Sequence, residues 1–166
     1  MLNYFTSKNK FTLYFLALSS LFLNSIAFVT IPKFINEKIT LNNPNVNYGS
    51  TLEIIETFID GIILAPLLET LIFQHLIFKL SRFIIKNNKL SLILFLTVSS
   101  LSFGLSHFSS LVYIVYTVFI GFIFAFFYEV FYLKRSKPYW NVVFLHAMFN
   151  FILFLISIVL ILVGIE

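Results

Sequence analysis

The chain has 166 residues, of which 60% are hydrophobic and only 11% are charged. Its mean hydropathy of +0.98 excludes a water-soluble globular fold, because a chain of this length cannot bury so much apolar surface. It contains no cysteine, which excludes a disulfide framework, a thiolate nucleophile and a thiolate metal site. The composition predicts an integral membrane protein of the all-α class.

Five apolar stretches are long enough to cross a bilayer as helices, since about 20 residues span the hydrocarbon core. In chain order they are residues 11–31, 61–80, 90–108, 111–133 and 139–164. We therefore expect a polytopic membrane helix bundle that forms one domain over residues 1–166. Residues 1–60 are expected to hold an anchor helix, an external loop and an interfacial helix, and residues 61–164 a helical core.

The basic residues predict which side of the membrane each loop faces. When five helices are threaded through a bilayer, nine of the eleven Lys and Arg residues fall on one side, and only Lys33 and Lys38 lie opposite. By the positive-inside rule the N-terminus is then cytoplasmic in a multi-pass protein of the cell membrane. The net charge of +4 fits this topology and contact with anionic membrane lipid. Nothing in the sequence predicts binding of nucleic acid.

The N-terminal third carries two further signals. A basic start, an apolar run and the small-x-small triplet at 25–27 also resemble a cleavable signal peptide, but the run continues to about residue 31 and favours a retained anchor. After the polar loop 32–50, Ser50 and Glu53 have the spacing of a capping box, so a helix should begin there and lie in the interface. Unbroken to residue 86 it would reach roughly 54 Å, so we expect a bend at Gly61 or Pro66.

Three ionisable side chains lie within predicted spans, where a charge costs several kcal/mol unless it faces a cavity or a partner. They are Glu69, His107 and His146. Phe103 precedes His107 by four residues and Asn150 follows His146 by four, so each pair shares a helix face. Taken singly, these residues favour packing, interhelical hydrogen bonding or an interfacial position. Together they predict one polar site.

The order and spacing of these residues resemble a known family, the CAAX prenyl protease and bacteriocin-processing intramembrane proteases, abbreviated CPBP or Abi. That family shows E-E-x-x-x-R after a proline, then F-x-x-x-H, then H-x-x-x-N. This chain reads APLLETLIFQ, FGLSH and HAMFN within about residues 61–154. It departs from the first motif at Thr70 and Gln74. Replacing both members of a buried ion pair can be nearly neutral, and these two side chains can keep a hydrogen bond between them.

The resemblance implies an intramembrane endopeptidase that cleaves a hydrophobic, membrane-embedded or lipidated peptide, with bacteriocin processing or self-immunity as candidate roles. It makes Glu69 the general base on a water that His107 helps to hold, and it assigns His146 and Asn150 to the oxyanion. The residues expected to support the site structurally are Pro66, Thr70, Gln74 and Phe103.

Other interpretations stay open at this point. The chain can be an inactive scaffold that binds a membrane partner, or a small proton-coupled transporter that uses the same acid and imidazoles. Peptide hydrolysis by this site needs no cofactor. Glu69, His107 and His146 can instead ligate zinc with an open position for water, although the H-E-x-x-H signature is absent. The sequence leaves the oligomeric state open.

Four residues outside these motifs also carry predictions. His75 is expected at the interface, Glu129 is expected to pair with loop cations, and Tyr139 and Trp140 are expected in the aromatic belt.

Straight helices do not align the candidate site in depth. At about 1.5 Å per residue, Glu69 lies some 13 Å from the outer end of its helix and His107 only about 5 Å, while His146 lies farther in. A shared site therefore requires tilted or shifted helices.

Overall fold

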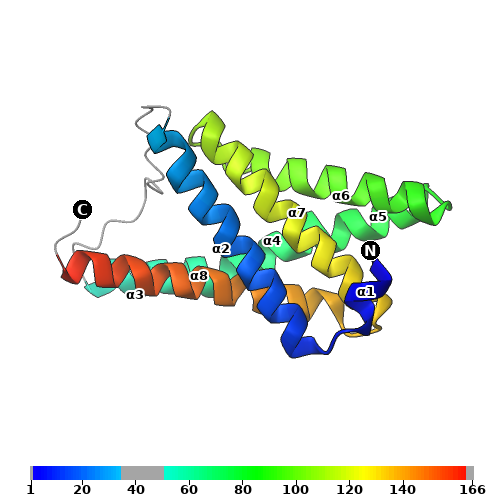
Figure 1. The fold of residues 1–166 in the computed structure, drawn as a ribbon, viewed down its shortest axis with the longest axis horizontal. Helices are drawn as coiled ribbons and strands as arrows, with labels where there is room; N and C mark the ends of the chain where they lie inside the picture. The colour runs from blue at the N-terminus through cyan, green and yellow to red at the C-terminus, as the bar shows by residue number, and fades with distance from the viewer. Residues whose placement is uncertain (1, 35–50, 164–166) are drawn as a thin grey trace.

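The computed structural model describes residues 2–34 and 51–163, and in these residues every regular element is a helix (Figure 1). The elements are α1 (Leu2–Ser7), α2 (Lys10–Phe34), α3 (Thr51–Phe58), η1 (Ile59–Leu64), α4 (Ala65–Glu69), η2 (Thr70–Leu76), α5 (Ile77–Ile84), α6 (Asn88–Leu105), α7 (Leu111–Leu133) and α8 (Pro138–Leu162). The elements η1 and η2 are π-helical segments inside one longer helix.

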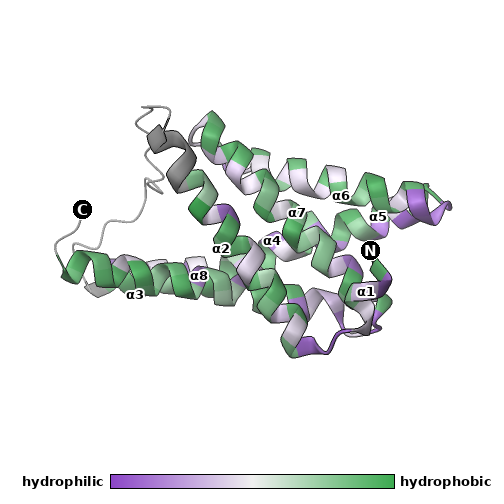
Figure 2. Cartoon of the chain, viewed as in Figure 1, coloured by the Kyte–Doolittle hydropathy of each residue, from purple (hydrophilic) through white to green (hydrophobic). Residues whose placement is uncertain are grey.

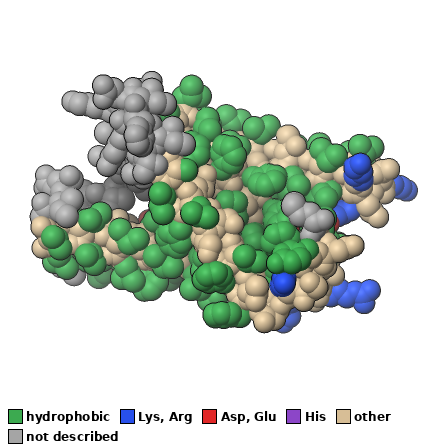
Figure 3. All heavy atoms as spheres, viewed as in Figure 1, with side chains coloured by type: hydrophobic (Ala, Val, Ile, Leu, Met, Phe, Trp, Pro, Cys, Tyr) green, Lys and Arg blue, Asp and Glu red, His purple; other side chains and the backbone are tan. Residues whose placement is uncertain are grey.

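Five helices of the described part are long and apolar enough to cross a membrane, which confirms the predicted all-α polytopic bundle. Most of their surface is hydrophobic, while hydrophilic residues gather at the turn between α5 and α6 and at the link between α1 and α2 (Figure 2). The Lys and Arg side chains visible in Figure 3 lie toward the same end of the molecule. The cytoplasmic N-terminus and the division of the chain at residue 60 stay predictions.

Helix α7 is the centre of the bundle and packs against α2, α6 and α8. Half of its most apolar window is buried inside the protein, against a third or less in the other four spans. Large rings fill this core edge to face, as Phe95 and Phe78 do at 5.2 Å between ring centroids. Rigid aromatic packing of this kind fixes the rotamers of neighbouring side chains.

Helices α6 and α7 cross closely near the end of α6 because glycine occupies both contact points. A Cβ atom added at Gly104 would lie 2.9 Å from the backbone nitrogen of Val118 and 3.0 Å from the carbonyl oxygen of Ile114. A Cβ atom at Gly121 would lie 2.8 Å from the Cβ atom of Phe103. These crowding atoms belong to backbone or lie next to it, so a change of rotamer cannot move them away. The crossing therefore sets the position of the loop that follows α6.

We expect Gly104→Ala to lower the free energy of unfolding by about 1–3 kcal/mol, as overpacking does in tight cores. Gly61→Ala is the matched control, because a Cβ atom there meets nothing within 4 Å. Since alanine is the better helix former by about 1 kcal/mol, this control should be neutral or stabilising. Thermal unfolding of both purified variants in detergent measures the difference. Equal unfolding temperatures would contradict the close crossing.

The second span runs without a break over Leu52–Ile84, a stretch of 33 residues. The bend expected at Gly61 or Pro66 stays a prediction, while two π-helical segments interrupt the α-helix, one containing Gly61 and one following Glu69. Such segments widen the helix and are a recognised cause of kinks.

Helix α3, expected to be interfacial, continues directly into this span, and Phe58 packs against Phe154 of α8 at 5.8 Å between ring centroids. The capping serine at position 50 and most of the predicted loop 32–50 lie outside the described residues. Helix α2, which was expected to end near residue 31, continues to Phe34.

Candidate active site

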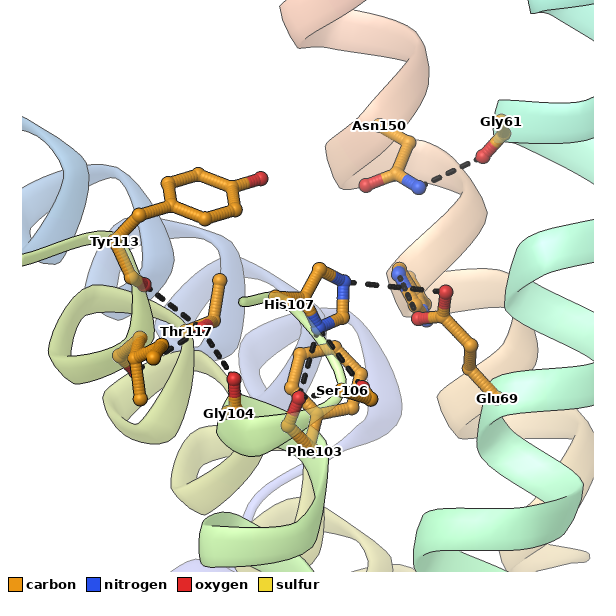
Figure 4. Close-up of polar contacts among 11 residues, drawn as sticks. Gly61, Glu69, Phe103, Gly104, Ser106, His107, Tyr113, Thr117 and Asn150 are labelled. Atoms are coloured by element: carbon orange, nitrogen blue, oxygen red, sulfur yellow. Dashed lines mark hydrogen bonds and ion pairs between the residues drawn. The ribbon is translucent and has the colours of Figure 1, made fainter. Parts of the chain in front are cut away.

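Three of the four predicted catalytic side chains meet between helices that are distant in the sequence. Figure 4 shows Glu69 and His107 facing each other. Glu69 ends α4, His107 follows α6 and His146 lies in α8. The Nε2 atom of His107 lies 4.0 Å from Oε1 of Glu69, and the Nε2 atom of His146 lies 3.8 Å from Oε2. The side chains of Glu69 and His107 are 25% and 24% exposed, whereas that of His146 is 5% exposed. The carboxylate thus faces both imidazoles and is accessible to a small molecule.

His107 reaches the carboxylate because it lies beyond the end of its helix. Helix α6 ends at Leu105, and the backbone N–H of His107 donates to the carbonyl of Gly104 at 3.1 Å. The imidazole then folds back and packs on the ring of Phe103, with 4.7 Å between the ring centroids. The depth mismatch expected from straight helices therefore does not keep these residues apart. Phe103 is buried, and its predicted role in supporting the site stays a prediction.

The hydrogen bonds of His107 fix its tautomer. Its Nδ1 atom lies 2.8 Å from the carbonyl oxygen of Phe103, and a carbonyl oxygen can only accept. Nδ1 therefore carries the hydrogen, and in the neutral ring Nε2 presents a lone pair toward Glu69. A water molecule can donate to this lone pair and to the carboxylate together, since the 4.0 Å gap is too wide for a direct hydrogen bond.

His146 is held by aromatic rings. Its imidazole lies 4.5 Å from the ring of Phe124 and 5.9 Å from the ring of Phe103, measured between centroids. Its Nδ1 atom is buried and has no hydrogen-bond partner in the described part of the chain. Packing of the ring, and not a bond to Nδ1, thus directs Nε2 at the carboxylate.

Asn150 has a partner that the sequence analysis did not predict. In a π-turn the carbonyl oxygen of Gly61 would accept from residue 66, five positions on, but Pro66 has no N–H. The N–H of Ala65 is bonded to the carbonyl of Asp60 instead. The Nδ2 atom of Asn150 donates to this unpaired Gly61 oxygen at 2.7 Å. Asn150 thus links α8 to the second span, and its predicted role at the oxyanion stays a prediction.

Thr70 and Gln74 are both completely buried, but the hydrogen bond predicted between them is wrong. Neither the hydroxyl oxygen of Thr70 nor either polar atom of the Gln74 side chain has a partner among the described residues. Thr70 begins the π-helical segment η2, and the spacing brings both side chains to one buried face without directing their polar atoms toward each other. Pro66, the other predicted supporting residue of this helix, is buried in α4.

The prediction for Glu129 is confirmed. Its Oε1 atom lies 2.6 Å from Nη2 of Arg82, a cation in the last turn of α5. Arg82 also donates through Nη1 to the side chain of Asn88 at 3.1 Å.

The interfacial interpretation of His75 and Tyr139 missed their contacts within the bundle. His75 Nδ1 lies 2.5 Å from the hydroxyl of Tyr128, and its ring lies 5.5 Å from that of Tyr139. The Tyr139 hydroxyl donates to the carbonyl of Leu67 at 3.1 Å. Trp140 is 59% exposed, which fits a membrane-facing ring. Sequence spacing alone does not distinguish a belt tyrosine from one that bonds a neighbouring helix.

The described residues contain no group of three or more His, Cys, Asp or Glu side chains arranged to hold a metal ion. Zinc binds nitrogen and oxygen ligands at about 2.0–2.2 Å, so a metal would require the three candidate side chains to move closer together. The zinc alternative remains a prediction that a chelator can test.

Comparison with known protein families places a range of these helices in a described family. A family model described as type II CAAX prenyl endopeptidase, Rce1-like, matches residues 51–152. The matched range runs from α3 into α8 and contains Glu69, His107, His146 and Asn150. Searches of curated proteins and of solved structures found no match.

Proposed function

The chain belongs to the Rce1-like family of type II CAAX prenyl endopeptidases, and on that premise we propose that it is an intramembrane endopeptidase acting on a membrane-embedded or lipidated peptide. The observation that carries the proposal is the meeting of Glu69, His107 and His146 from three spans, with both imidazoles within 4.0 Å of one carboxylate. A membrane-spanning chain rarely keeps such groups without a function for them.

In the proposed reaction, a water molecule lies between Glu69 and Nε2 of His107. Glu69 takes a proton from this water while its oxygen attacks the carbonyl carbon of the peptide bond. The carbonyl oxygen becomes an oxyanion, to which His146 donates a hydrogen bond from Nε2. When the C–N bond breaks, Glu69 returns the proton to the leaving amine. The products are a new carboxylate and a new amine, and no cofactor is consumed.

A second candidate is an inactive scaffold that binds a membrane partner. It is favoured by the departure from the family motif at Thr70 and Gln74, because their buried polar atoms lack partners within the described chain. Such groups cost stability unless they serve a site.

The experiment that tests the proposal is peptide cleavage by the purified full chain in detergent. The probe is an internally quenched peptide with a prenylated cysteine followed by three residues, the arrangement that defines a CAAX sequence. We expect cleavage of this peptide and no change on adding a chelator. Loss of activity with chelator would instead favour the zinc alternative.

A second probe separates the possible roles. Cleavage of an unprenylated, membrane-inserted leader peptide in place of the prenylated one would support bacteriocin processing or self-immunity. Cleavage of neither peptide by a folded wild-type protein would favour the scaffold.

A further inference from the structure

The proposed reaction needs more than one hydrogen-bond donor for the oxyanion, and the structure limits where they come from. His146 offers only Nε2, since its Nδ1 atom is buried while Nε2 lies 3.8 Å from Oε2 of Glu69. Asn150 directs its amide nitrogen to the carbonyl of Gly61, away from the carboxylate of Glu69 (Figure 4). A further hydrogen-bond donor next to His107 would complete the oxyanion site.

Tyr113 lies next to His107. It belongs to the first turn of α7, where its backbone N–H donates to the hydroxyl of Ser110 at 3.1 Å and so fixes the start of the helix. Its ring centroid lies 6.2 Å from that of His107, at an interplanar angle of 60°. In Figure 4 the phenol lies beside His107 and points toward Asn150, so its hydroxyl faces the space between these two side chains.

Two observations indicate that the Tyr113 hydroxyl has a role other than packing. It makes no hydrogen bond to any other described residue of the chain, and the side chain is only partly buried. A polar hydroxyl in an apolar bundle normally finds a partner within the protein, so one that faces an accessible site is free to bind a ligand there.

We propose that the Tyr113 hydroxyl binds the carbonyl oxygen of the scissile peptide bond and donates a hydrogen bond to the oxyanion, opposite the water held by Glu69 and His107. The proton stays on the phenol throughout, so the step adds no acid or base to the reaction. This inference rests on the proposed peptidase function.

Tyr116 supplies a matched control, because it is the next tyrosine of the same helix and performs a structural task. It is 9% exposed, and its hydroxyl lies 2.9 Å from the hydroxyl of Ser25 in α2. The rings of Tyr113 and Tyr116 lie 5.8 Å apart, so both phenylalanine variants change the same aromatic cluster by one oxygen atom.

The test measures kcat and KM of the wild type, Tyr113→Phe and Tyr116→Phe with the peptide that the wild type cleaves. A donor that acts on the oxyanion strengthens in the transition state, so Tyr113→Phe should lower kcat by about 10²-fold and leave KM within about twofold. Tyr116→Phe should keep kcat within about threefold of the wild type, and any loss should follow its unfolding temperature.

Peptide binding in a Glu69→Gln background gives a second readout, and there Tyr113→Phe should change the dissociation constant by less than about threefold. A kcat of Tyr113→Phe close to the wild type would overturn the inference while leaving the peptidase intact. An equal loss in Tyr116→Phe would also overturn it, because the effect would then belong to the aromatic cluster. If the folded wild type cleaves no peptide, the proposed function fails and this inference fails with it.

Discussion

Glu69→Gln should lower kcat for peptide cleavage by about 10²- to 10⁴-fold, the contribution that general acid–base catalysis makes. Glutamine keeps the shape of the side chain and its carbonyl oxygen, but it cannot accept a proton from water at neutral pH. The two imidazoles would still lie beside residue 69, so KM should change little. The measurement is steady-state cleavage of the prenylated peptide by purified protein.

The same substitution should not destabilise the fold. The Glu69 carboxylate has no direct hydrogen bond to either imidazole, and a charge in an apolar bundle costs stability that a neutral amide avoids. The unfolding temperature of Glu69→Gln should therefore equal or exceed that of the wild type.

Glu56→Gln is the matched control for this variant. Glu56 is an exposed carboxylate of the same long helix, so its loss should change neither activity nor stability. A Glu69→Gln protein that cleaves at the wild-type rate would remove Glu69 from the mechanism. A parallel loss in Glu56→Gln would point to an indirect effect of helix charge.

The sequence predicted the spans and the partners of this site because a membrane imposes a simple rule on both. Apolar runs of about 20 residues must be helices, and an ionisable group within them must find a partner. That rule predicted that Glu129 pairs with a cation. It also predicted one polar site for Glu69, His107 and His146. Their 3.8–4.0 Å separations follow from tertiary packing, which no spacing along one helix determines.

The features that sequence analysis missed depend on departures from regular helix geometry. Thr70 and Gln74 share one buried face of the π-helical segment η2, but their polar atoms do not meet. The resemblance implies an oxyanion role for Asn150, which stays a prediction, while the bond of its side chain to a carbonyl of η1 was not predicted. One signal was present in the sequence: a proline five residues after Gly61 leaves that carbonyl without a backbone partner if the turn is π-helical.

His107 shows a different limit. Counting residues along α6 places it near the outer end, but the residue lies in the turn that follows the helix. The direction of its ring is set by the carbonyl of Phe103 and by the glycine contacts that bring α6 and α7 together. Small residues at helix crossings are common in membrane bundles. Such a residue predicts a helix crossing only when the helix that faces it is known.

Arg82→Leu should lower the free energy of unfolding by about 3–5 kcal/mol, because it leaves the Glu129 carboxylate buried without its cation. The side chain of Glu129 is 3% exposed, whereas that of Arg82 is 22% exposed. The guanidinium also lies 5.3 Å from the ring of Phe78 and 5.9 Å from the ring of Tyr132. Loss of the cation and loss of the carboxylate should therefore destabilise the protein by different amounts. Glu129→Leu should cost less, since the long Arg82 side chain can extend to the polar boundary of the membrane.

The double variant Arg82→Leu/Glu129→Leu should recover most of the loss, as replacement of a whole buried pair can be nearly neutral. Lys79→Leu, an exposed cation of the same helix, is the matched control and should change stability little. Unfolding of the wild type, the two single variants and the double variant in detergent gives the coupling free energy as a double-mutant cycle. Additive losses in the double variant would show that Arg82 stabilises the bundle through ring packing and not through its charge. The sign of that coupling also bears on Thr70 and Gln74, where the chain carries two neutral side chains in place of the ion pair that the resemblance implies.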